Sequence, residues 1–161
     1  MKKPTKRGWG LVLLTVALAG TLAAATMLPG LATPGINSAS TLLARGTDQS
    51  PGTLPFREGT DVVVAQNTFE VGGSSGWHSH PGGVIVVVQQ GELTLYRSVG
   101  NHCESTRYTA GQSFIERPDD VLNGVNTGSI QTIVYAVFPN VPIGGPTRVD
   151  VANDPGTCPG V

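Results

Sequence analysis

The chain has 161 residues, a length typical of one domain, and its ten basic and eleven acidic residues give a net charge of −1. Four of the basic residues lie within the first 25 positions, which hold no acidic residue, so the remainder carries a net charge of −5. Its six basic residues are all arginines and are scattered along the chain, which argues against a nucleic-acid partner.

The N-terminal segment has the features of an export signal. Basic residues precede an uncharged stretch at 8–36, and two A-x-A-like cleavage sites lie at 23–25 and 30–32. We therefore predict that residues 1–32 are a signal peptide. The alternative is an uncleaved membrane anchor, because the stretch is long enough to span a bilayer. Either would place the rest of the chain in a secreted or extracytoplasmic location, with the membrane contacted only through this segment.

Residues 33–60 are rich in Gly, Ser, Thr and Pro, and they are predicted to form a linker and an N-terminal arm with one short strand at 40–44. From residue 61 to the end the pattern is β, without a helical period. The expected strands are 61–66, 84–90, 92–97, 105–109, 112–116 and 130–138. Gly91, Gly100-Asn101 and Gly111 are predicted to mark tight hairpins between them. Short strands at this spacing predict an all-β sandwich or small barrel over 61–161.

The only cysteines are Cys103 and Cys158. A disulfide between them fits an oxidising compartment, and the alternative is two free thiols. Prolines at 139, 142 and 146 end the last expected strand. We expect the tail that follows to lie over the barrel wall, held by Cys158.

His78 and His80 are the most informative residues of the chain. They lie between a glycine-rich turn and an apolar strand, and residues i and i+2 of an extended segment point to the same face. Two imidazoles that share one space are a plausible start for a metal site. The alternative is a pair of neutral imidazoles that are hydrogen-bonded within the barrel.

The spacing of Gly72, His78, His80 and Gly91 resembles the first sequence motif of the cupin superfamily, and residues 111–128 resemble its looser second motif. The resemblance covers about 61–138 and implies a double-stranded β-barrel of the jelly-roll type. The Trp-His-Ser-His-Pro run also resembles that of small secreted cupins. Those proteins pair a mid-chain cysteine with a C-terminal one, which implies the disulfide named above.

The resemblance further implies a divalent-metal site built from two histidines and a glutamate of the first motif and a histidine of the second. Here the glutamate position is Val84, and the last histidine position is Leu122 or Asn123, so the metal-ligand set is degenerate. Glu116 is a candidate third ligand, because its alternation with Phe114 could turn it inward. Asn123 is another candidate, although it is also a common turn residue. The metal, if one binds, would be Fe, Mn, Ni, Cu or Zn; otherwise no cofactor is expected.

Val84, Val86 and Val88 alternate on one strand and are predicted to form an apolar wall beside the histidines. Such a cavity suits a small, partly apolar ligand. Trp77 and Tyr135 are further candidate ligand contacts. The alternatives are that Trp77 packs in the barrel and that Tyr135 faces solvent.

Three functions fit these patterns, and the sequence leaves open whether the chain is an enzyme. We expect an exported binding module for a small molecule, since the family's ligand set is incomplete. The first alternative is a metal-dependent enzyme of the dioxygenase or isomerase type. The second is a structural exported domain, with a homodimer formed through its β-edges.

Overall fold

The computed structural model describes residues 41–50, 53–152 and 154–161, and the predicted leader at 1–32 lies outside them. All the described residues belong to one compact unit, Ser40–Val161. No helix capable of crossing a membrane occurs among them. They form ten strands: β1 (Thr47–Asp48), β2 (Asp61–Phe69), β3 (His78–Ser79), β4 (Val84–Gln90), β5 (Glu92–Val99), β6 (His102–Thr109), β7 (Gln112–Glu116), β8 (Val121–Val125), β9 (Thr132–Val141) and β10 (Val149–Asp150).

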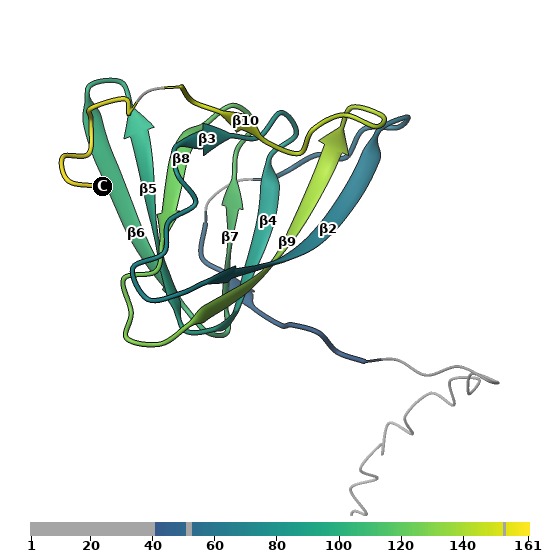
Figure 1. Cartoon of the computed structure of the whole chain (residues 1–161). Coiled ribbons are helices and arrows are strands. Elements are labelled where there is room, and N and C mark those ends of the chain that lie inside the picture. The colour runs from purple at the N-terminus through teal and green to yellow at the C-terminus, as the bar shows by residue number, and fades with distance from the viewer. Residues whose placement is uncertain (1–40, 51–52, 153) are drawn as a thin grey trace, which may run out of the picture. The chain divides into compact units, whose positions relative to one another are not determined.

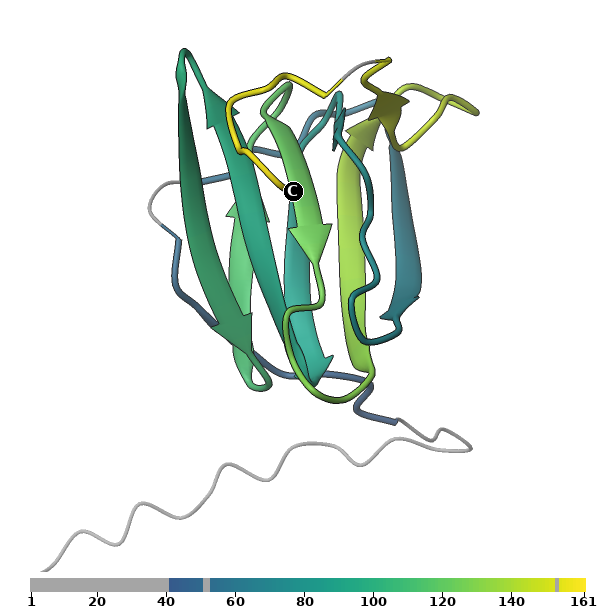
Figure 2. The ribbon, with the colours of Figure 1, turned by 60° about the vertical axis from the view of Figure 1, so that its left-hand side comes forward.

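The strands form two five-stranded sheets that face each other (Figure 1 and Figure 2). We call them sheet A, in the order β1-β7-β4-β9-β2, and sheet B, in the order β10-β3-β8-β5-β6. Apart from the parallel contact between β1 and β7, the strand pairs are antiparallel. The prediction of a small all-β barrel is therefore confirmed.

Side chains alternate between the interior and the outer surface along the long strands. In β4 the residues Val84, Val86 and Val88 are buried, whereas the residues between them are half-buried on the outer face. The same alternation in β9 and β5 fills the space between the sheets. Tyr108 and Phe114 stack at the centre of this core, with ring centroids 4.2 Å apart. The period of two that identified the strands is thus also what builds the core.

Two of the three predicted hairpins are wrong. β4 and β5 lie in different sheets, so Gly91 joins the sheets instead of closing a hairpin, and Gly111 does the same between β6 and β7. Gly91 has φ 74°, and a Cβ added there would lie 2.5 Å from Thr132 Oγ1. The crossing therefore needs glycine for both conformation and space. The hairpin at Gly100-Asn101 is confirmed, because β5 and β6 pair up to Val99 and His102.

The predicted short strand at 40–44 does not form over the described residues 41–44, and β1 lies a few residues further along. β8 was missed because Asn123-Gly124 is typical of a turn. In the structure β8 pairs with β3 and with β5, so tertiary pairing overrides the weak strand propensity of these residues.

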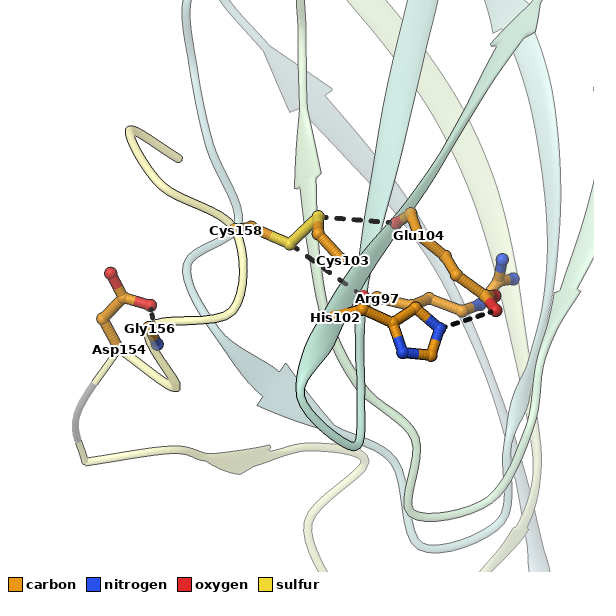
Figure 3. Close-up of a disulfide and its surroundings, with 7 residues drawn as sticks. All are labelled: Arg97, His102, Cys103, Glu104, Asp154, Gly156 and Cys158. Carbon is orange, nitrogen blue, oxygen red and sulfur yellow. Dashed lines mark hydrogen bonds and ion pairs between the residues drawn. A yellow bond between two sulfur atoms is a disulfide. The ribbon is translucent and has the colours of Figure 1, made fainter.

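The C-terminal tail crosses sheet B and is tied down at its end. β10 pairs with β3, through Val149 opposite Ser79 and Asp150 opposite His78. Further on, Cys158 is bonded to Cys103 at the start of β6, which confirms the predicted disulfide (Figure 3). The tail is therefore fixed at Val149–Asp150, beside the two histidines, and again at Cys158, at the far edge of the sheet.

Candidate metal centre

His78 and His80 are held at the short strand β3, which pairs with β8 on one side and β10 on the other. Both residues are only 5% exposed. Their rings are perpendicular, with centroids 4.7 Å apart. The prediction that the two imidazoles project into one space is confirmed.

The Nδ1 atoms of both rings are engaged by backbone carbonyl groups. His78 Nδ1 lies 2.7 Å from Gly76 O, and His80 Nδ1 lies 2.6 Å from Thr147 O. A carbonyl oxygen only accepts a hydrogen bond, so each Nδ1 is a donor, and Nε2 is the atom of each ring that could bind a metal ion. This arrangement of a second hydrogen bond is what fixes histidine ligands in metal sites.

Glu116 completes a group of three donors. Its Oε2 lies 3.2 Å from His80 Nε2, and the residue is 6% exposed. It ends β7 directly opposite Val84 of β4. Directly paired residues point to the same face of a sheet, with Cβ atoms about 5 Å apart. The carboxylate therefore comes from the cross-strand neighbour of the position where the cupin motif has its glutamate.

Burial lowers the pKa of His78, and the positive charge of Arg148 and the neighbouring His80 act in the same direction. The carbonyl of Gly76 and the charge of Glu116 oppose this effect and do not overcome it. His78 is consequently neutral at physiological pH. The neutral imidazole is the form that binds a metal ion.

The donor set fits a divalent cation. One ligand atom from each of His78, His80 and Glu116 lies within 4.8 Å of the others. Two ligands on opposite sides of a transition metal lie about 4.2 Å apart, so these atoms nearly have the span of a first coordination shell. Two histidines and a carboxylate suit Fe(II) and also zinc, and they leave coordination positions open for a substrate. The three residues could hold a metal ion whose identity they do not fix.

The second-motif position adds no fourth donor. Leu122 pairs with His78 and packs in the core, so a side chain without donor atoms occupies the place beside the ring. Asn123 is not part of the group of three. Its Oδ1 accepts hydrogen bonds from Ser74 Oγ at 2.8 Å and Ser75 Oγ at 3.3 Å, so it secures the preceding loop instead.

The three donors lie on the wall of a cavity of about 660 Å³ between the sheets. Val84 and Val86 line it, as the predicted apolar wall requires. The other apolar lining residues were not foreseen; they are Val63, Ala65, Phe69, Leu93, Val134, Ala136 and Phe138. The cavity thus has an extended apolar wall and a polar corner at the histidines, and a second group of polar residues lines it elsewhere: Gln66, Asn67, Thr68, Glu70, Ser74 and Ser75.

Three residues expected to contact a ligand lie outside this lining, which corrects that part of the prediction. Val88 is fully buried deeper in the core. Tyr135 alternates with the buried Val134 and Ala136, so it faces the outer surface, where its hydroxyl donates to Gln66 Oε1 at 2.8 Å. Trp77 is buried next to His78, and adjacent strand residues point to opposite faces.

Sequence reasoning also missed two polar residues of the cavity, Thr147 and Arg148. They belong to the Pro-rich tail, for which no period or motif was available. Their position follows from the pairing of β10 with β3, and only the structure gives that pairing. The single signal in the sequence was Cys158, which predicted that the tail returns to the barrel.

Two histidines and a carboxylate thus meet at a cavity between the two sheets of a small β-barrel, where they could hold a metal ion. The family model described as "Cupin domain" matches residues 66–138, which span most of both sheets and all three donor residues. Residues 66–138 are therefore a cupin domain, and the described part of the chain has the fold of the cupin superfamily.

Solved structures are similar to this chain, and the two with a TM-score of 0.50 support the assignment of the fold. An oxalate oxidase is 27% identical, with a TM-score of 0.50 over 56% of this chain and 46% of its own. An oxalate decarboxylase is 17% identical, with a TM-score of 0.50 over 57% and 24%. A double-stranded β-helix protein from Klebsiella pneumoniae is 28% identical, with a TM-score of 0.43 over 50% and 69%. The match spans about half the length of the oxalate oxidase. No curated protein sequence is significantly similar to the chain.

Proposed function

We propose that this cupin is a divalent-metal-dependent enzyme that acts on a small organic molecule by oxidase or oxygenase chemistry. The observation that carries the proposal is the convergence of His78, His80 and Glu116, with both Nδ1 atoms locked, on the wall of the cavity. This replaces the binding module that the sequence favoured. That preference depended on a missing carboxylate, and Glu116 supplies one.

A bound divalent ion would contribute open coordination positions and, if it is iron, redox chemistry. The residues of the chain would do the rest. The carbonyls of Gly76 and Thr147 hold the two imidazoles in the tautomer that presents Nε2. Val84 and Phe138 line the cavity beside them and exclude water from that side of the site.

The similarity to an oxalate oxidase supports an enzyme over a structural domain, since that protein is named for the oxidation of a small acid. The disulfide and the predicted leader together support export, which we also propose. A homodimer stays a prediction from the sequence.

A binding module is the second candidate. Leu122 at the second-motif position leaves three donors where the motif provides four, and the cavity also has an extended apolar wall. A protein of this kind would bind its ligand without a resident metal.

The test is metal analysis of the purified full-length chain, beside a His78→Ala/His80→Ala variant and a His102→Ala control. His102 is exposed and lies far from the cavity lining. We expect close to one Fe, Mn, Ni, Cu or Zn per chain in the wild type and in the control, and none in the double variant. Oxygen uptake with a panel of small organic acids then tests for catalysis. A wild type that holds no metal after reconstitution would leave the binding module.

A further inference from the structure

We infer that Arg148 makes this cavity a site for small organic carboxylates, with the guanidinium group binding the carboxylate of the ligand beside the metal. The inference deepens the proposed function, because it assumes that His78, His80 and Glu116 hold an ion. It concerns a residue outside the segment that the cupin family model matches, which is 66–138. Arg148 is thus a feature of this chain and not of the motif.

The register of the tail places Arg148 at the site. Val149 lies opposite Ser79 and Asp150 opposite His78, so the same register brings Arg148 opposite His80. Thr147, just before it, accepts the hydrogen bond from His80 Nδ1.

The side chain of Arg148 lines the cavity. Its Nη2 lies 3.8 Å from the point that a Cβ on Gly76 would occupy, two residues before His78. Its charge also contributes to the lowered pKa of His78. The guanidinium group therefore lies near the metal ligands, and its charge acts on them.

Arg148 is oriented by one partner and keeps most of its donors. Its Nε donates to Asp150 Oδ1, and Asp150 is largely exposed on its outer side. Among the described residues this is the one polar partner of the side chain. The four N–H groups on the two Nη atoms are left for a ligand. A planar guanidinium group pairs with a carboxylate through two parallel hydrogen bonds, which an ammonium group cannot do.

The charges of the cavity favour an anion once an ion is bound. A divalent cation and Arg148 together outweigh Glu116 and the one other carboxylate of the lining, Glu70. Glu70 is exposed and accepts a hydrogen bond from Gln131 Nε2 at 2.6 Å.

The apolar wall then limits the chemical group that can be attached to the carboxylate of the ligand. Leu93, Val84 and Phe138 suit a short hydrocarbon body, and the Phe138 ring lies 5.3 Å from that of His80. A small carboxylic acid satisfies both halves of the cavity, whereas a small amine carries the wrong charge for Arg148 and a free sugar lacks the apolar body.

The experiment compares butyrate with its neutral isostere butyramide. Both are titrated by calorimetry into the full-length chain, with Co(II) loaded and with metal removed. The Co(II) absorption spectrum reports whether the probe reaches the ion. The variants are Arg148→Gln, Arg148→Lys and the control Arg107→Gln, which removes a surface arginine paired with Glu92.

We expect butyrate to bind at least 10-fold more tightly than butyramide to the wild type and the control. Arg148→Gln should weaken butyrate by about 10-fold to 100-fold and leave butyramide unchanged. It should not weaken Co(II), because it removes a positive charge from beside the metal ligands. Arg148→Lys should be intermediate, because it keeps the charge and loses the paired geometry. Thermal unfolding of each variant verifies that it is folded.

Equal binding of butyrate and butyramide to the wild type, no binding of butyrate, or no effect of Arg148→Gln would each overturn the inference. Failure of the proposed function is a separate result, in which the wild type takes up no Co(II). The metal-free titrations still decide the role of Arg148 in that case. Without the ion, butyrate should bind the wild type more weakly than the Co(II)-loaded chain, and it should bind the Gln variant more weakly again; equal binding to the metal-free wild type and Gln variant would overturn the inference.

Discussion

Glu116 and the two histidines reach the same cavity from regions with very different amounts of support. β7, which carries Glu116, is paired with β4 over four residues and with β1 on its other side. β3 has two residues, and its pairing with β8 is limited to His78 and Leu122. The carboxylate is therefore placed by a long ladder inside sheet A.

The histidines depend instead on the tail. β10 covers the free edge of β3, and the carbonyl of Thr147 orients His80. The disulfide at Cys158 then fixes the far end of that tail. The comparison shows that the donors of one site can be positioned in two ways. The register of sheet A positions Glu116, and a tail fixed by a disulfide positions the two histidines.

Removal of the disulfide should have the largest effect, on the region that holds the histidines. The Cys103→Ser/Cys158→Ser variant opens a loop with a sequence separation of 55 residues, which costs about 4 kcal/mol in the chain-entropy model. Denaturant unfolding should show a loss of this size. Metal affinity should fall by about 10-fold to 100-fold, since Thr147 no longer holds His80 firmly.

Hydrogen exchange of the same variant locates the effect. Under native conditions β3, β10 and the tail should lose local protection, whereas the paired amides of β4 and β9 should exchange only through global unfolding. Local opening in β4 and β9 to the same extent as in β3 would contradict the contrast between the two regions.

Substitution of Glu116 should have the next largest effect. Glu116→Gln keeps the shape of the side chain and removes its charge, so metal affinity should fall by about 100-fold, as measured by chelator competition. Adding Val84→Glu should restore part of this affinity, because residue 84 lies directly opposite on β4.

Val87→Glu in the Glu116→Gln background is the matched control. It adds the same charge to the same strand, but on the outer face. It should restore no affinity. Equal recovery by Val84→Glu and Val87→Glu would mean that general charge, and not cross-strand position, determines metal binding.

A smaller effect is expected from pH. Burial holds the pKa of His78 below 6.5, so the folded metal-free chain binds fewer protons there than the unfolded chain does. The resulting stability is complete above about pH 6.5 and is lost as the pH falls toward the lower pKa of the folded state. Denaturant midpoints of wild type and His78→Gln between pH 7.5 and 5 should converge at the acidic end. Parallel curves would show that His78 does not contribute to the acid sensitivity.

Tyr135→Phe should have the smallest effect. The hydroxyl donates one exposed hydrogen bond to Gln66 Oε1 on the outer face of sheet A. We expect a change in stability within about 0.5 kcal/mol and unchanged metal and butyrate affinities. A clear loss of butyrate binding would place Tyr135 in the path of the ligand and would sharpen the boundary of the cavity.

Much of the fold could be predicted from the sequence, because β-branched and aromatic residues alternate along the long strands. The strands at 84–90 and 112–116 were predicted with the bounds that the structure has. The connections between strands could not be predicted, since a glycine at positive φ occurs both in a hairpin and in a crossing between sheets, as Gly91 shows. β8 was hidden because its Asn and Gly have low strand propensity.

The candidate site divides in the same way. His78 and His80 followed from the period of a strand, and Glu116 was one of two candidates for the third ligand, from its alternation with Phe114, beside Asn123. The place of Arg148 depends on where a segment without periodicity docks. The docking of that segment is set by its register with β3 and by a disulfide between cysteines 55 residues apart in sequence. Neither is a local property of the sequence.

The fastened tail also sets an order of assembly. During synthesis the ribosome releases residues 78, 80 and 116 well before Thr147, and the tail is secured only after Cys158 has emerged and been oxidised. Contacts that join such distant parts of a chain form late in folding. An oriented His80 is therefore a product of maturation. A metal ion offered to the nascent chain would meet an unfinished site, and the compartment where the disulfide forms would determine which ion is incorporated.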